Sequence, residues 1–208
     1  MANVGLLLQA FGAVSGLGVG TQAQFQKAVD CSSGITTFTK STAIPVDLPC
    51  ASLIKEDLSF NLDANSLSMF DRTAHLSWLA ANEALQQSGL NELNDLGLDR
   101  SGIFWGTGFG GSNTLDSAYQ EIFLNGKQRA RPFTIIGVMA NGSAGLLAIQ
   151  TGFKGPSMGD LLNGMRLIKP MPLERLLEVL NMVFAIGQLL AAEQNLFLML
   201  AQLKRGRL

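Results

Sequence analysis

Hydrophobic residues along this chain alternate between short unbroken runs and helix-like repeats. The run at residues 3–8 leads into a glycine-rich stretch at 12–18, which predicts a buried strand that enters a turn. A second run at 102–105 predicts another buried strand. Residues 29–67 are rich in Ser, Thr and Asp and have little periodicity, so we expect a loop with short strands there.

Three further segments have features of helices. Asp71 is suited to cap a helix that ends at Gly89, and the apolar positions sharing one face of it are Leu76, Leu79, Ala80, Ala84 and Leu85. A second amphipathic helix, followed by Gly126, is predicted from Leu115, Ala118, Tyr119, Ile122 and Phe123. Between 132 and 149, three glycines would let a helix pack closely against another backbone: Gly137, Gly142 and Gly145. Strands alternating with helices predict an α/β layered fold.

The balance of apolar and charged residues predicts that much of the surface is covered. The chain has 208 residues and a mass of 22.2 kDa, which suits one core. It is 47% hydrophobic and 15% charged, whereas an average soluble domain carries roughly 25% charge. We therefore expect burial against a second subunit or against missing sequence. The formal net charge of -1 creates no general field for nucleic acid, which is not an expected partner.

Two thiols and one histidine limit the candidate chemistry. Cys31 and Cys50 lie in polar, turn-rich sequence without an adjacent basic residue, and we interpret them as ordinary thiols. His75 lies beside apolar helix positions and is interpreted as a packing or surface residue. A single histidine cannot build a multi-histidine metal site, so we expect neither a metal nor a cofactor. No signal-peptide pattern opens the chain, which favours a reduced cytoplasm.

The segment Gly106-Thr107-Gly108-Phe109-Gly110-Gly111 satisfies the GxGxxG spacing between a predicted strand and a predicted helix. A dinucleotide site would also need a carboxylate about 20 residues later to bind the ribose. After Glu121 the next acidic residue is Asp160. We therefore favour a close-packed turn between strand and helix over a nucleotide site.

A series of landmarks resembles the N-terminal half of β-ketoacyl-acyl-carrier-protein synthases, in register over about residues 3–158. The early landmarks are Phe11-Gly12-Ala13-Val14-Ser15, Leu17-Gly18, Ser33-Gly34-Ile35, Phe70-Asp71-Arg72 and Ala80-Ala81-Asn82-Glu83-Ala84-Leu85. The later ones are Asp99-Arg100-Ser101-Gly102-Ile103, the glycine segment, Arg131-Pro132-Phe133, Asn141 and Gly152-Phe153-Lys154-Gly155-Pro156-Ser157. Gln9-Ala10 departs from the usual Thr-Gly, which indicates a divergent member.

The resemblance implies an incomplete thiolase-like layered α/β/α fold and, for the intact parent, condensation of an acyl thioester with malonyl-acyl-carrier protein. Fatty-acid and polyketide pathways both use this reaction. The implied partners are acyl carrier protein and a second subunit in a homodimer or heterodimer. The implied machinery is a cysteine nucleophile and two histidines from the second half. The cysteine position would overlap Met165, so no catalytic residue is assigned. We expect the chain as written to be inactive and poorly soluble alone.

Residues 159–208 have a different character, with 14 leucines in 50 residues, and we treat them as a second unit after the ketosynthase-like unit 1–158. Pro172, Glu174 and Glu178 suit the start of a helix, and Lys204, Arg205 and Arg207 suit its end, so the tail is predicted to be helical. Its longest uncharged run, 179–192, is shorter than the roughly 20 residues needed to cross a bilayer. The tail is then either a partner-binding helix or not a native ketosynthase sequence.

A shift in reading frame is a hypothesis for the origin of the tail. Codons for residues 163–169, read one base later, can encode Thr-Ala-Cys-Ala-Ser-Ser, the ketosynthase nucleophile segment. Codons for 171–182 and the first two bases of the next codon, read two bases later, can encode Ala-Ile-Gly-Glu-Ala-Phe-Arg-Gly-Ile-Lys-Tyr-Gly, which resembles the helix that follows it. The hypothesis is two single-base slips, near 158–162 and near Pro170. Two alternatives remain open: a non-catalytic subunit of the chain-length-factor type, and an interaction protein that binds through the tail helix.

Overall fold

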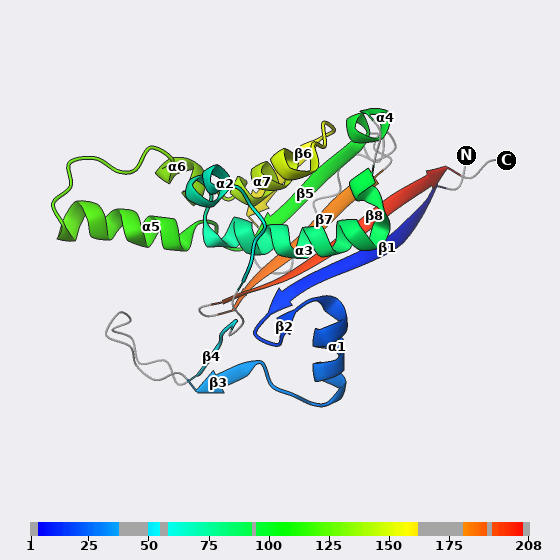
Figure 1. Cartoon of the computed structure of the whole chain (residues 1–208), viewed down its shortest axis with the longest axis horizontal. Coiled ribbons are helices and arrows are strands. Elements are labelled where there is room, and N and C mark those ends of the chain that lie inside the picture. The colour runs from blue at the N-terminus through cyan, green and yellow to red at the C-terminus, as the bar shows by residue number, and fades with distance from the viewer. Residues whose placement is uncertain are drawn as a thin grey trace.

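The computed structural model describes residues 4–37, 50–54, 58–92, 95–161, 181–190 and 193–205. A mixed sheet lies against a layer of helices, and a small lobe containing α1, β3 and β4 projects at the bottom of the view in Figure 1. The elements in chain order are β1 (Val4–Ser15), β2 (Gly18–Val19), α1 (Thr21–Val29), β3 (Ile35–Thr37), β4 (Cys50–Ser52), α2 (Ala64–Met69), α3 (Arg72–Ser88), η1 (Leu90–Glu92), α4 (Asp95–Asp99), β5 (Ser101–Thr107), α5 (Ser112–Tyr119), η2 (Gln120–Leu124), α6 (Thr134–Val138), α7 (Gly142–Thr151), β6 (Ser157–Leu161), β7 (Asn181–Leu190) and β8 (Glu193–Arg205).

The main sheet has the strand order β2-β1-β8-β7-β5-β6. Strand β5 runs parallel to both of its neighbours, and Ile103 pairs with Ser157 of β6 and with Val183 of β7. Strands β7 and β8 form an antiparallel hairpin, and β8 is also antiparallel to β1. The last two strands that the structure describes therefore occupy the middle of the sheet.

Helix α3 packs against β1, β8 and α7, and small residues allow the close approach. Ala80 and Ala84 are fully buried, and a Cβ on Gly12 of β1 would collide with the Ala80 carbonyl oxygen. Ile103 and Leu147, each 1% exposed, continue the same core. Burying an aliphatic side chain of that size stabilises the fold by roughly 1.5–3 kcal/mol.

The structure confirms the predicted ends of the first long helix. The Asp71 carboxylate accepts a hydrogen bond from the Thr73 N–H at the start of α3, and Gly89 ends the helix with a left-handed φ of 72°. The two predicted strands are also present as β1 and β5. Strand β1 continues past the predicted turn at Gly12 and ends at Ser15. Gly12 lies within the strand, at the point where the backbone of α3 approaches it.

The glycine-containing segment at 132–149 forms two short helices, α6 and α7, separated at Met139, which has an extended ψ of 138°. The predicted close approach is confirmed at Gly137, where an added Cβ would lie 2.9 Å from the Thr114 Cγ2 atom. Helix α6 therefore lies directly against α5.

The prediction of a helical tail is wrong for the part of the tail that the structure describes, because β7 and β8 are strands. A long apolar run fits a fully buried strand as well as a buried helix, and the pattern alone does not separate them. Here β7 and β8 lie between β1 and β5 in the sheet, so residues 181–190 and 193–205 form no helix. The predicted helix start at Pro172 lies outside the described residues. No helix in the described ranges is long and apolar enough to span a membrane.

Candidate functional site

The glycine segment forms a tight turn between β5 and α5. Gly111 has a left-handed φ of 59°, and a Cβ there would collide with the Gly137 carbonyl oxygen. A Cβ on Gly110 would lie 2.9 Å from the Ala140 Cα atom. A side chain at either glycine would collide with the backbone of α6 or of the link after it, so the turn is close-packed, as predicted.

Asp71 holds the starts of two helices together. Its Oδ1 atom accepts from the Thr73 N–H at 3.0 Å, and its Oδ2 atom accepts from the N–H and the hydroxyl of Thr114, both at 2.7 Å. The side chain is 4% exposed. Sequence reasoning identified the cap on α3 but missed the bond to α5, because 43 residues separate Asp71 from Thr114.

A pocket of about 430 Å³ opens between the start of α3, α5 and the segment before α6. Phe70, Ala118 and Phe133 supply apolar walls, and Arg72 and Arg131 supply cations. Arg131 is paired with Glu121, whereas Arg72 is exposed and forms no ion pair with the described residues. Such a lining suits an anionic group with an apolar neighbour.

Glu121 of η2 and Arg131, which both line this pocket, belong to a charged cluster that also includes Lys127. The Arg131 Nε and Nη2 atoms donate to Oε1 of Glu121 at 2.9 and 2.5 Å, and the Lys127 Nζ atom lies 3.3 Å from the same oxygen. The Arg131 hydrogen bonds, more than any other cause, lower the pKa of the Glu121 carboxyl, and the same pairing raises the pKa of Arg131. Glu121 therefore stays ionised as the anchor of two cations.

The second predicted helix ends in an unexpected way, because α5 passes into the π-helical turn η2. In that turn the Asn125 N–H donates to the Gln120 carbonyl oxygen at 3.0 Å. The predicted apolar stripe is poorly covered: Tyr119 is 56% and Phe123 is 72% exposed, and their rings stack with centroids 5.3 Å apart. Amphipathic spacing thus located the helix but did not imply burial in this chain.

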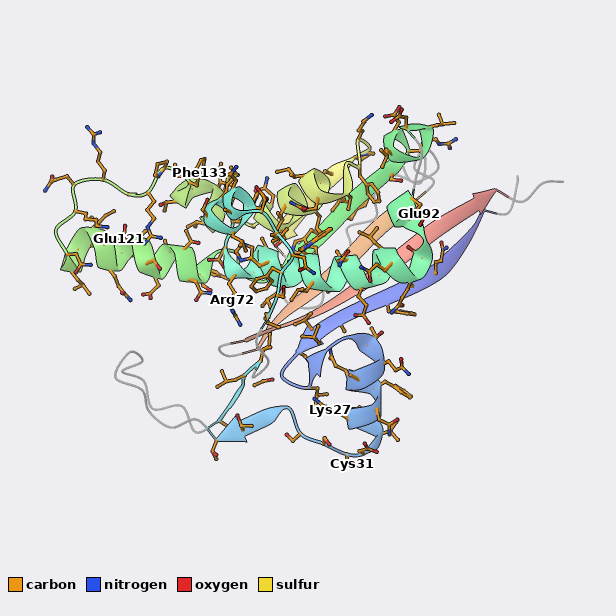
Figure 2. All side chains as sticks on the ribbon, in the orientation of Figure 1. Lys27, Cys31, Arg72, Glu92, Glu121 and Phe133 are labelled. Carbon is orange, nitrogen blue, oxygen red and sulfur yellow. The ribbon has the colours of Figure 1, made fainter. Side chains whose placement is uncertain are left out.

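Neither thiol lines this pocket. Cys31 is exposed on the lobe of α1 and β3. Glu121 and Phe133, which line the pocket, lie on the opposite arm of the molecule in Figure 2. Cys50 is exposed at the start of β4 on the same lobe as Cys31. Both positions fit the interpretation of ordinary thiols.

His75 is a packing residue, as predicted. It is 8% exposed, its ring lies 5.2 Å from the Phe60 ring, and its Nε2 atom lies 3.4 Å from the Ser66 carbonyl oxygen. Burial lowers the pKa of the imidazole, because the charged form loses solvation. The neutral ring then donates to Ser66.

The predicted nucleophile position follows strand β6. At its end, Asp160 pairs with Gly106 and Leu161 pairs with Thr107, so β6 finishes beside the start of the glycine turn. Carboxyl ends of parallel strands are where open α/β sheets place their reactive groups. Met165 itself lies outside the described residues.

Comparison with known proteins identifies the family. The family model for the β-ketoacyl synthase N-terminal domain matches residues 11–159. The 3-oxoacyl-[acyl-carrier-protein] synthase 2 of Staphylococcus aureus (strain MRSA252) is 26% identical over 156 residues, and that of Coxiella burnetii is 27% identical over 154 residues. Each alignment covers 74% of this chain and 37% of the relative, so the chain spans a little over a third of these relatives.

Solved structures agree on the fold. A type II polyketide ketosynthase in complex with its acyl-carrier protein has a TM-score of 0.75 at 15% identity, covering 98% of this chain and 64% of that one. A β-ketoacyl synthase from Burkholderia phymatum has a TM-score of 0.75 at 10% identity, with coverage of 98% and 60%. The ishigamide ketosynthase/chain length factor has a TM-score of 0.73 at 14% identity, with coverage of 98% and 59%. The predicted thiolase-like α/β fold is confirmed, and the chain belongs to the β-ketoacyl synthase family, whose N-terminal domain it contains.

Proposed function

We propose that this chain is a ketosynthase domain that has lost its acyl-accepting thiol. The intact parent would condense an acyl thioester with malonyl-acyl-carrier protein. One observation carries the proposal: the sequence that follows Gly155-Pro156-Ser157 contains no cysteine, and both thiols of the chain lie exposed on the lobe of α1, β3 and β4. Without a thiol beside the glycine turn, the acyl group has no covalent attachment point.

The test is acyl transfer to the protein. The full chain is incubated with an acyl-acyl-carrier-protein thioester, and the acyl adduct is measured by intact mass, with the Staphylococcus aureus synthase as the active control. No adduct is expected on this chain. Acylation of Cys31 or Cys50, or turnover of malonyl donors, would overturn the proposal.

This proposal attributes the sequence of the tail to shifted reading frames. Strand β6 keeps its place beside the glycine turn up to Leu161, and the recoverable nucleophile segment begins only two residues later. DNA sequencing across codons 155–185 tests the idea directly, because one shifted frame must encode Ala-Cys-Ala-Ser-Ser. A frame-corrected gene should then yield a protein that accepts an acyl group, whereas absence of the motif from both shifted frames rejects the frameshift.

The proposed partner is acyl carrier protein, and the proposed docking surface is the segment 125–131, which we call the basic loop. Lys127, Arg129 and Arg131 are all exposed, and no acidic residue occurs between Glu121 and Asp160. A positive surface of this kind attracts an acidic partner. Binding of a carrier protein should therefore weaken as the salt concentration rises. A titration at two ionic strengths measures the dissociation constant, and a value that does not change with salt concentration would contradict this prediction.

A second candidate is a non-catalytic subunit of the chain-length-factor type. The missing cysteine favours it, and similar folds occur in the ishigamide ketosynthase/chain length factor and in a Xenorhabdus doucetiae ketosynthase bound to its chain length factor. Such a subunit should co-purify with an active ketosynthase at a fixed ratio and change its product length. Failure to associate with any coexpressed ketosynthase would reject this role. Both candidates place the protein in the cytoplasm.

A further inference from the structure

We propose that Glu121 is a positioning residue for the basic loop, which sets the cations in place for carrier-protein binding. The inference rests on the proposed docking function and adds a residue that makes no contact with the partner itself. Glu121 lies at the base of the loop with only 11% of its side chain exposed, while Lys127 and Arg131 remain 56% and 70% exposed. The anion is covered and its two cations face outward.

The loop is fixed at both ends, and one carboxylate links the two ends. At its start the Lys127 N–H donates to the Glu121 carbonyl oxygen at 3.0 Å, and Gly126 has a left-handed φ of 65°. At its end the Thr134 N–H donates to the Arg131 carbonyl oxygen at 3.1 Å. The Glu121 carboxylate joins the two ends through side chains. A loop held in this way loses less conformational entropy when a partner binds.

Each cation keeps free donors after pairing with Glu121. Arginine has five N–H donors, of which Arg131 uses two on Oε1, and the Lys127 ammonium has three. Three like charges within five residues would otherwise repel one another and spread the loop. The covered carboxylate offsets this repulsion, so the cations can be held at a spacing that matches acidic groups on a partner.

The sign of one substitution separates positioning from plain charge. Glu121→Gln removes a negative charge from a surface that binds an acidic protein, so simple Coulomb attraction predicts tighter binding. Loss of positioning predicts weaker binding. Arg131→Lys gives a second contrast: the charge stays, but the two-pronged hydrogen bonding to one carboxylate is lost. Charge alone predicts no change for that variant.

The experiment measures carrier-protein affinity for the full chain and its variants at low and moderate salt. Positioning predicts that Glu121→Gln and Arg131→Lys each weaken binding about three- to tenfold and flatten its salt dependence. The matched control is Asp116→Asn on α5, an exposed carboxylate that accepts from the Gln120 side chain at 2.8 Å. That variant should leave the affinity unchanged or slightly tighter. Urea titrations check that each variant is folded.

Two contrary outcomes are distinguishable. Unchanged or tighter binding by Glu121→Gln, together with unchanged binding by Arg131→Lys, overturns the positioning role if Arg129→Gln still weakens binding. In that case the docking surface stands. If Arg129→Gln and Lys127→Gln have no effect, or the full chain binds no carrier protein, the docking proposal itself fails and the positioning role fails with it. Should Glu121→Gln not fold, Arg131→Lys alone decides.

Discussion

Two carboxylates, Asp71 and Glu83, join elements of this domain by collecting backbone N–H groups. Glu83 on α3 accepts from the N–H of Ala13 at 3.0 Å and from the N–H of Thr21 at 2.7 Å, which ties α3 to β1 and to the start of α1. Asp71 joins α3 to α5 in the same way. Hydrogen bonds to a charged group are each worth roughly 1.5–3 kcal/mol, so single residues of this kind decide whether distant segments stay together.

Replacing one carboxylate oxygen of Asp71 tests whether this residue joins α3 to α5. In Asp71→Asn, an NH2 group replaces one of the two carboxylate oxygens. The N–H of either Thr73 or Thr114 then faces another donor and loses its acceptor. We expect the free energy of unfolding to fall by about 2–4 kcal/mol. Urea denaturation measures it. The control is Asp63→Asn, because Asp63 is exposed and caps only α2, where Asn caps equally well. Similar losses in both variants would contradict the bridging role of Asp71.

His75 predicts a pH dependence of stability. Its pKa in the folded chain lies below the ordinary value of 6.5, so below that pH the unfolded chain binds a proton that the folded chain does not. Stability should be constant above about pH 7 and fall as the pH decreases through 6.5, with a slope of at most about 1.4 kcal/mol per pH unit. Urea midpoints at several pH values measure the slope.

The matched variant for this pH test is His75→Gln, which keeps a donor for the Ser66 carbonyl oxygen but does not titrate. His75 is the only histidine of the chain, so no other side chain of ordinary pKa titrates in that window. The variant should therefore show a flat stability profile between pH 7 and pH 5.5. An equally steep profile in the variant would assign the pH dependence to another group.

Among the elements, those with local signals were predictable and those defined by distant pairing were not. Asp71 and Gly89 delimit α3, and both signals lie within the helix's own sequence. Strands β7 and β8 depend on β1 and β5, which lie far away in the sequence, and an apolar run does not reveal that its partners are strands. The exposed stripe on α5 escaped prediction for a related reason, since spacing shows which residues share a face but not what covers it.

The central position of β8 gives a prediction at this scale. Leu198 pairs with Gly12 of β1 and with Ala185 of β7, so Leu198→Pro removes an N–H from the middle of the sheet. We expect a loss of at least about 2 kcal/mol or of cooperative unfolding altogether. The control is Gln22→Pro in the exposed first turn of α1, where proline is tolerated. Equal stability of both proline variants would show that β8 does not contribute to the core.

At the scale of the whole molecule, one arm carries exposed apolar residues beside the basic loop. The arm formed by α5, η2 and α6 exposes Phe123, Leu124 and Ile135 at 72%, 79% and 75%, beside the basic loop. Exposed apolar patches on a folded chain mark surfaces that contact another molecule. The low overall charge of the chain fits this arrangement, because a covered surface needs fewer charged residues.

This arm is therefore expected to drive self-association of the isolated chain. Phe123→Ser, Leu124→Ser and Ile135→Ser combined should lower its apparent mass toward that of a monomer in sedimentation and light-scattering measurements, since each change removes apolar area that water must otherwise solvate. The matched control removes three exposed apolar residues from the other lobe: Phe25, Val29 and Ile35. If the control disperses the protein and the arm variant does not, the associating surface lies on the α1 lobe. If the unmodified chain is already monodisperse at all concentrations, neither apolar surface associates, and the low charge needs a different cause.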